Sequence, residues 1–220
     1  MPGARNGKRG PARPEPSPPG EEPEKRRAIL HAAVRVFAEK GYHGCRIADV
    51  ARQAGVAYGL VYHYFRNKDE LLESVFAEQW TIFINAIRAI SDGPGTASDH
   101  LASICRFAVD VYKTSPSAVR VLLLEVARTP NVLRAGSTPQ TFQAAVALVA
   151  GIVRRGQREG DLRGDADPTV AAACLLGALE LTLTAAVVGL VGGSREEDAE
   201  RMKQAVIDFV LHGLSVRPRG

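Results

Sequence analysis

Hydrophobic residues recur at helical spacing along most of the chain from residue 22 onward. The first apolar face, with an i, i+4, i+7, i+8 pattern, is formed by Ile29, Ala33, Val36 and Phe37. Gly41 follows where a C-cap glycine is expected. The sequence contains no alternating apolar and polar run bounded by hairpin turns, and no internal repeat. The pattern therefore predicts an all-α protein.

Two short helices are expected next, over residues 47–54 and then up to about Phe65, with Gly55 in the turn between them. Asn67 is a favourable N-cap residue with Glu70 three positions later, so a long helix should begin there and run to about residue 90. The run SDGPG at positions 91–95 interrupts it. Later helix starts are indicated by capping residues at Thr138-Pro139, Asp167-Pro168 and Ser194–Glu197.

The segment Thr169–Val191 carries a single charge, Glu180, and is long enough to cross a bilayer. A charge near its centre and the lack of a basic flank or an aromatic belt argue against a membrane span. A helix that is apolar on nearly all faces is instead expected to be buried on two sides, by its own subunit and by a partner. Together with the segment Arg195–Gly213 it predicts a homodimer interface that includes Leu176 and Phe209.

The composition of the chain is that of a soluble protein, and its 28 basic and 24 acidic residues are nearly equal in number. Of 220 residues, 45% are hydrophobic and 24% charged, and the net charge is +4. Residues 1–20 carry four basic residues and one acidic residue, a local +3 (4 − 1), and are rich in proline and glycine. We therefore expect a disordered basic arm over residues 1–21, either a solvated tail or a weak phosphate contact.

Three widely spaced cysteines, Cys45, Cys105 and Cys174, show no metal-ligand spacing and are odd in number. A zinc site or a disulfide framework is not expected, and a reducing, cytoplasmic location fits better. The N-terminal segment has no apolar stretch of the kind found in signal peptides. No nucleophile, phosphate-binding or metalloprotease motif occurs either, so we expect neither an enzyme nor a bound cofactor or metal.

The most informative window is the run GYHGCRIADVARQAGVAYGLVYHYFRNKDELL at positions 41–72. Two short helices joined by a glycine-bearing turn form a helix-turn-helix, whose second helix enters the major groove of DNA. The first turn of that helix, expected to meet base edges, holds Tyr58, Gly59 and Leu60. The rest of this helix and the residues after it supply four side chains of the kind that donate hydrogen bonds to phosphates: Tyr62, His63, Tyr64 and Lys68.

The run from Arg27 to Leu72 resembles the DNA-binding domain of the tetracycline-repressor (TetR) family. It has the features of that family in order: a helix ending FAEKGY, an I-A-x-x-A-G-V core, the aromatic run YHYF and then NKDELL. The resemblance implies operator-reading positions at Ala57, Tyr58, Gly59 and Leu60, and phosphate contacts at Tyr62, Tyr64 and Lys68. It also implies a helix start that touches phosphate at Cys45 and Arg46.

This chain departs from the family pattern at two of those positions. Cys45, a poor hydrogen-bond donor, stands where a threonine or serine usually caps the helix, and Ala57 replaces a frequent serine. These departures affect two of the family's phosphate contacts, and Arg46 is a candidate to replace one of them. The resemblance predicts a DNA-binding domain over residues 22–68 and a ligand-binding and dimerisation domain over 69–220.

Aromatic residues spread over separate helices of the second domain are candidates for lining one apolar cavity, although such residues are often plain core. They are Trp80, Phe83, Phe107, Tyr112 and Phe142. The stretch from residue 125 to 191 is similar to the C-terminal domain of fatty-acid-degradation repressors of the same family, which implies a long-chain acyl-CoA as inducer. Cations that are candidates for contacting its phosphates are Arg120, Arg128, Arg154, Arg155 and Arg158.

The sequence thus predicts a ligand-responsive repressor that binds operator double-stranded DNA as a homodimer and is released by a small hydrophobic molecule. Two alternatives stay open. One is a repressor of the same fold that senses drugs or another metabolite. The other is a helical adaptor that binds only protein, although such an adaptor has no need of the YGLVYHYF helix.

Overall fold

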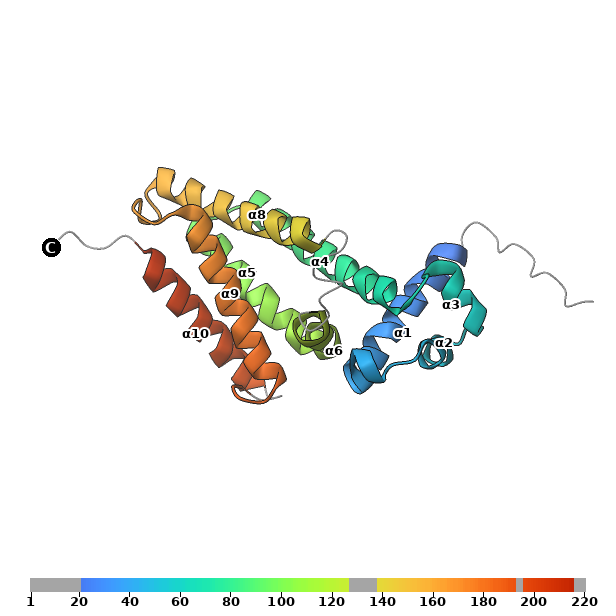
Figure 1. Ribbon diagram of the computed structural model, residues 1–220. Helices are drawn as coiled ribbons and strands as arrows, with labels where there is room; N and C mark the ends of the chain where they lie inside the picture. Colours follow the sequence, from blue (N-terminus) through green and yellow to red (C-terminus); the bar gives the residue numbers. More distant parts are fainter. Residues whose placement is uncertain (1–20, 127–137, 193–195, 216–220) are drawn as a thin grey trace, which may run out of the picture.

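The computed structural model describes residues 21–126, 138–192 and 196–215, and these residues are almost entirely helical (Figure 1). The helices are α1 (Glu21–Gly44), α2 (Ile47–Ala54), α3 (Tyr58–Tyr64), α4 (Lys68–Asp92), α5 (Ala97–Thr114), α6 (Pro116–Arg120), the π-helix η1 (Val121–Val126), α8 (Thr138–Glu159), α9 (Pro168–Val187) and α10 (Glu196–Leu214). The described part of the chain forms no strand, only an isolated bridge between Leu162 and Ser215. The predicted all-α fold is confirmed.

The small N-terminal lobe is built on α1, α2 and α3, with the beginning of α4 closing it (Figure 1). Its core contains large, fully buried side chains from each long helix, such as Phe37 of α1, Phe65 after α3 and Phe76 of α4. Sequence reasoning expected α1 to end at Gly41. The structure instead has a kink there, with φ 69°, a value that favours glycine, and a further turn to Gly44.

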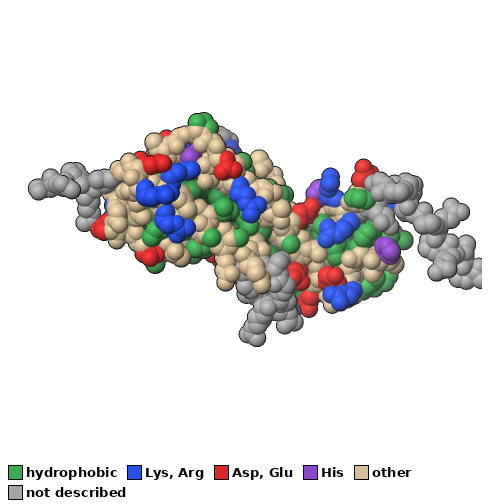
Figure 2. Space-filling view, turned by 90° about the horizontal axis from the view of Figure 1, so that it is seen from above, with side chains coloured by type: hydrophobic (Ala, Val, Ile, Leu, Met, Phe, Trp, Pro, Cys, Tyr) green, Lys and Arg blue, Asp and Glu red, His purple; other side chains and the backbone are tan. Residues whose placement is uncertain are grey.

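The larger lobe is a bundle in which α5 packs against α8 and α10, and α8 packs against α4 and α9. Its separate hydrophobic core includes Leu101, Ile104, Ile152 and Leu175, all fully buried. Figure 2 shows the two lobes in space-filling view, with a narrower waist between them. The long helix α4 passes from one lobe to the other (Figure 1), so it contributes to both cores.

Capping interactions fix the helix starts that the sequence indicated. The Asn67 side chain accepts a hydrogen bond from the Glu70 amide at 2.8 Å, as predicted for α4. Asp167 accepts two amide bonds at the start of α9, both at 2.9 Å. The start of α8 at Thr138 also agrees with the prediction. Residues 1–20 of the basic arm, Arg128, Ser194 and Arg195 lie outside the described residues. Glu21, the last residue assigned to the arm, is the first residue of α1.

Helix α9 is 20 residues long and apolar enough to cross a membrane, by length and composition only. Within the protomer it packs against α5, α6, α8, α10 and η1. Even so, only 33% of its most apolar stretch is buried there. A large part of an apolar helix is therefore left uncovered by a single copy of the chain.

Candidate DNA-binding surface and ligand site

The turn between α2 and α3 is set by Gly55, which has φ 68° and ψ 30°. Its amide and that of Val56 donate back to the end of α2, which closes the corner as in a left-handed C-cap. Helix α2 buries three apolar residues, whereas α3 buries only Val61. Most of α3 therefore faces outward from the N-terminal lobe, as a recognition helix must.

The exposed face of α3 carries a pair of tyrosines one helical turn apart. Tyr58 is 54% exposed and Tyr62 43%, and their rings meet edge to face with centroids 5.2 Å apart. The Tyr58 hydroxyl donates to the Tyr62 hydroxyl at 3.3 Å, and this bond raises the pKa of Tyr62. Gly59, beside them, is exposed, and a Cβ there would meet nothing within 4 Å. The helix thus presents two phenols next to an unobstructed stretch of backbone.

The remaining candidate positions of α3 differ in exposure. Ala57 is exposed and caps the helix without a side-chain hydrogen bond. His63 is exposed, and its ring lies 5.1 Å from that of Tyr64. Tyr64 and Leu60 are half-buried, and Tyr64 packs against the core of the N-terminal lobe. The outward set on this helix is therefore Ala57, Tyr58, Gly59, Tyr62 and His63.

Lys68 occupies a position that sequence reasoning did not foresee. Its ammonium donates to the carbonyl oxygens of Tyr42 at 2.7 Å and Cys45 at 3.1 Å, and lies 4.3 Å from the centre of the Tyr42 ring. The Tyr42 hydroxyl also donates to Asp69. Lys68 therefore ties the start of α4 to the segment between α1 and α2, and two of its three donors are used within the chain.

The two candidates at the start of α2 separate in the structure. Cys45 is buried, its thiol donates to the Arg46 carbonyl at 3.6 Å, and burial raises its pKa to about 11. The surface that we retain therefore omits the Cys45 side chain. Arg46 is exposed, and its amide donates to Asp49 at 3.2 Å. Lys40 hydrogen-bonds to Asp49 and is the main cause of the lowered pKa of that carboxyl, with the Arg46 amide next.

Four of the five predicted ligand-site aromatics form one chain of ring contacts that runs along α4 between the cores of the two lobes. The ring centroid of Trp80 lies 4.8 Å from that of Phe142 and 5.4 Å from that of Phe83. The centroids of Phe83 and Phe107 are 6.2 Å apart. Sequence reasoning missed Phe76, whose ring is 5.7 Å from Trp80 and 6.0 Å from Phe142. Its position four residues before Trp80 on α4 is the signal that identifies it. We call these five rings the aromatic cluster.

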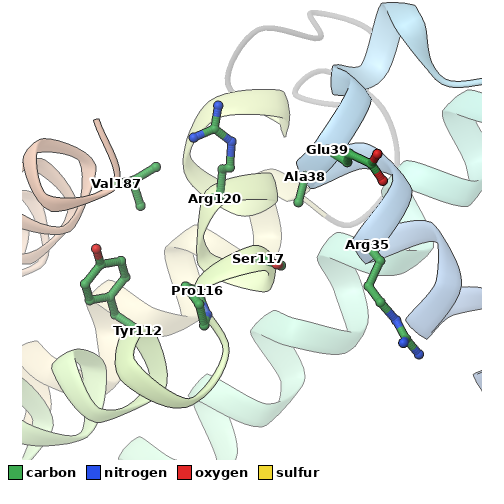
Figure 3. Close-up of a pocket in the computed structure, with 8 residues that line it drawn as sticks. All are labelled: Arg35, Ala38, Glu39, Tyr112, Pro116, Ser117, Arg120 and Val187. Carbon is green, nitrogen blue, oxygen red and sulfur yellow. The ribbon is translucent and has the colours of Figure 1, made fainter. Parts of the chain in front are cut away.

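Tyr112 lies apart from the aromatic cluster. It lines a cavity of about 360 Å³ between the two lobes, together with Arg35 and Glu39 of α1 and Arg120 of α6 (Figure 3). The figure shows the Arg35, Glu39 and Arg120 side chains spread around the gap and not touching one another. The predicted grouping of Tyr112 with the other aromatics is therefore not what the structure shows.

The uncovered apolar surface of α9 and α10 forms a groove of about 870 Å³. Leu181, 71% exposed, and Phe209, 74% exposed, both line it. Leu176, the α9 residue proposed from sequence for the dimer interface, is half-buried and packs against the core of its own protomer. Leu181 is thus the α9 residue that stands out on this face, and the apolarity of the whole helix concealed it from sequence reasoning.

An outward-facing recognition helix joined to a helical bundle is the architecture of a bacterial transcriptional regulator. Two family models match the chain: bacterial regulatory proteins of the tetR family over residues 29–75, and the tetracyclin repressor-like C-terminal domain over residues 98–210. The chain therefore belongs to the TetR family of transcriptional regulators.

Individual relatives extend this likeness across both lobes. The chain is 27% identical to the fatty acid metabolism regulator protein of Bacillus subtilis over 186 residues, 84% of this chain and 93% of the relative. The crystal structure of the transcriptional regulator FadR from Bacillus subtilis in complex with stearoyl-CoA superposes with a TM-score of 0.76, at 26% identity, over 85% of this chain and 98% of that one. The fatty acid degradation regulator FadR from Bacillus halodurans gives 0.78 and 25%, over 92% and 100%.

Proposed function

We propose that this chain is a cytoplasmic, homodimeric transcriptional repressor that a long-chain acyl-CoA releases from its operator. The likeness to the Bacillus subtilis regulator carries this proposal, because it extends over 84% of the chain and includes the ligand-binding lobe. The matching structure of that regulator holds stearoyl-CoA.

The first part of the proposal, DNA binding, uses the exposed face of α3. In this proposal Tyr58, which is exposed beside the open backbone at Gly59, meets base edges, and the exposed Tyr62 and Arg46 contact phosphates. Two copies related by a two-fold axis would bind a pseudo-palindrome whose half-sites lie on one face of the duplex, about one helical turn or a little more apart.

The second part of the proposal, dimerisation, uses the groove on α9 and α10. Leu181 and Phe209 are large apolar side chains that one protomer leaves in water, and burying each gains about 1.5–3 kcal/mol. A second copy of the same surface offers the matching apolar partner, as expected for an isologous two-fold interface. Covering this face also accounts for the apolar character of α9 without a membrane.

The third part of the proposal, ligand binding, uses the aromatic cluster. Phe142 is its most open ring, 38% exposed, and its centroid lies 4.8 Å from that of Trp80. An acyl chain entering here would displace Phe142 and lie against α4, the helix that joins both lobes. A shift of about 1.4 kcal/mol toward the state that does not bind DNA relieves repression tenfold. Each buried CH₂ supplies about 0.8 kcal/mol, so a long chain suffices.

A titration of a pre-formed protein–operator complex with a series of acyl-CoAs tests the proposal, with fluorescence anisotropy as the readout. We expect release at lower concentration as the chain lengthens from medium to long, and no release by free CoA. Release independent of chain length would contradict the acyl-CoA assignment. Release by an unrelated cationic drug, with no response to any acyl-CoA, would place the protein among drug-sensing repressors of the same family.

A further inference from the structure

The far end of the bundle, away from α3, holds a groove that the proposed function does not use. It lies between α8 and the loop at residues 160–167, has a volume of about 570 Å³ and is lined by Gly151, Arg154, Gln157, Arg158 and Gly164. Figure 2 shows arginine and lysine side chains gathered on this end of the large lobe. We call this the α8 groove.

The α8 groove has a one-sided charge. Arg154 and Arg158 are exposed, stand one helical turn apart and repel each other, and the described part of the chain offers neither an ion-pair partner. The lining contains no carboxylate. The acids of the loop have partners of their own: Asp161 accepts the Ser98 amide at 2.7 Å, Asp165 pairs with Arg163 at 2.6 Å, and Asp167 caps α9.

Arg155, between the two groove arginines in sequence, points elsewhere. It donates to the Ser91 carbonyl at 3.1 Å and contacts the buried His100, so it joins α8 to α5 and to the end of α4. This contrast indicates that one arginine of the run is structural. The other two have no ion-pair partner among the residues that the structure describes.

The α8 groove is held in shape before any ligand arrives. Gln157 donates to the carbonyls of Arg163 at 3.0 Å and Ala166 at 2.7 Å, which holds the loop against α8. The loop approaches α8 closely at Gly156, where a Cβ would lie 2.8 Å from Leu162. Gly151 and Gly164 also line the groove, and a Cβ at either position would meet nothing within 4 Å, so no side chain fills the space beside them.

We propose that the α8 groove binds a phosphoryl anion between Arg154 and Arg158. Guanidinium groups match the geometry of phosphate oxygens and stay charged at any physiological pH. The anion would come either from the nucleotide end of an acyl-CoA, a reading that rests on the proposed function, or from a free phosphate or nucleotide. The loop leads into α9 and its Arg163 amide bonds to Leu214 at the end of α10, at 3.0 Å. An anion bound here would stabilise the loop where it contacts α9 and the end of α10, the two helices of the proposed dimer interface.

Calorimetric titration of the full chain with inorganic phosphate and with adenosine 3′,5′-bisphosphate tests the site. We compare the wild type, Arg154→Gln/Arg158→Gln, and the control Arg88→Gln/Arg106→Gln, which removes two exposed arginines outside the groove. Each lost charged hydrogen-bond donor should weaken bisphosphate binding about tenfold, whereas the control should stay within about twofold. Failure of the wild type to bind either probe at low salt, or equal losses in both variants, would overturn the site.

The same variants, titrated with stearoyl-CoA, identify the source of the anion. Parallel losses for stearoyl-CoA and the bisphosphate assign the groove to the nucleotide end of an acyl-CoA. Unchanged stearoyl-CoA affinity beside lost bisphosphate binding assigns it to a free phosphate or nucleotide. Because neither titration contains operator DNA, binding of the phosphate probes stands or falls independently of whether acyl-CoA relieves repression.

Discussion

The α3 surface and the aromatic cluster use their aromatic side chains in opposite ways. On α3, Tyr58 and Tyr62 are exposed and contact each other, while Val61 and Phe65 supply the buried contacts of the same region. In the aromatic cluster, Trp80 packs against the core of the N-terminal lobe and Phe83 against that of the larger lobe, and both also face the proposed ligand path. On α3 the residues proposed for recognition are separate from those that hold the fold, whereas in the aromatic cluster the two sets overlap.

This difference has a consequence for how each lobe tolerates change. A substitution at an exposed recognition residue removes little buried area, so it alters binding and spares the fold. A substitution in the aromatic cluster removes packing together with the proposed ligand contact, because tightly packed rings respond to changes of even one methylene.

The largest expected effect tests whether the DNA-binding lobe acts without the dimer surface of the other lobe. Leu181→Asp or Phe209→Asp places an unpaired charge in the α9–α10 groove and should cost several kcal/mol of dimer stability. Operator affinity should then fall by about 100-fold or more, because two half-sites are no longer bound together. Sedimentation velocity and operator titration measure both effects.

The matched control is Ile82→Asp on α4, at a residue that is 53% exposed and does not line the groove. It should leave both the dimer and operator affinity unchanged. A wild-type protein that sediments as a stable monomer at micromolar concentration would disprove the dimer surface.

A smaller effect tests the contrast between the two aromatic sets. Phe76→Ala removes a buried ring that is 1% exposed, and should lower the free energy of unfolding by about 3–5 kcal/mol. Tyr58→Ala should lower it by less than about 0.5 kcal/mol and instead change the preference among operator variants. Denaturant unfolding and binding to an operator library measure the two quantities. An unaltered preference in Tyr58→Ala would remove this residue from base reading.

Sequence reasoning recovered what depends on local signals and missed what depends on the partners of a side chain. The fold class, the Asn67 cap and the glycine turn at residue 55 follow from short patterns, because capping and turn geometry involve neighbours in sequence. The long reach of Lys68 to the carbonyls of Tyr42 and Cys45 has no such signal.

The same distinction explains where the structure departs from the groupings predicted within the candidate sites. Tyr112 was grouped with the other aromatics on composition, yet its position on α5 directs it to the cavity between the lobes. In α9 nearly every position is apolar, so no periodicity separates Leu176, which faces its own core, from Leu181, which faces outward. Where the pattern has no contrast, only the packing decides.

The smallest effect concerns two cations of the DNA-binding lobe that the family resemblance treats alike. Arg46 is exposed, whereas the Lys68 ammonium donates to two carbonyls within the chain. Arg46→Ala should therefore leave stability unchanged and reduce the slope of log affinity against log salt by about one unit, as expected for one lost phosphate contact.

Lys68→Ala should instead lower the free energy of unfolding by about 1.5–3 kcal/mol, because carbonyls that accept from a charged group lose their donor. Its affinity for all operator sequences should fall together, with the salt slope of the wild type retained, since the loss arises from a displaced α1–α2 segment. Operator titrations between low and moderate salt, paired with denaturant unfolding, distinguish the two variants. A slope reduced by one unit in Lys68→Ala, with stability intact, would show that its third donor reaches a phosphate and that the contacts to Tyr42 and Cys45 are dispensable.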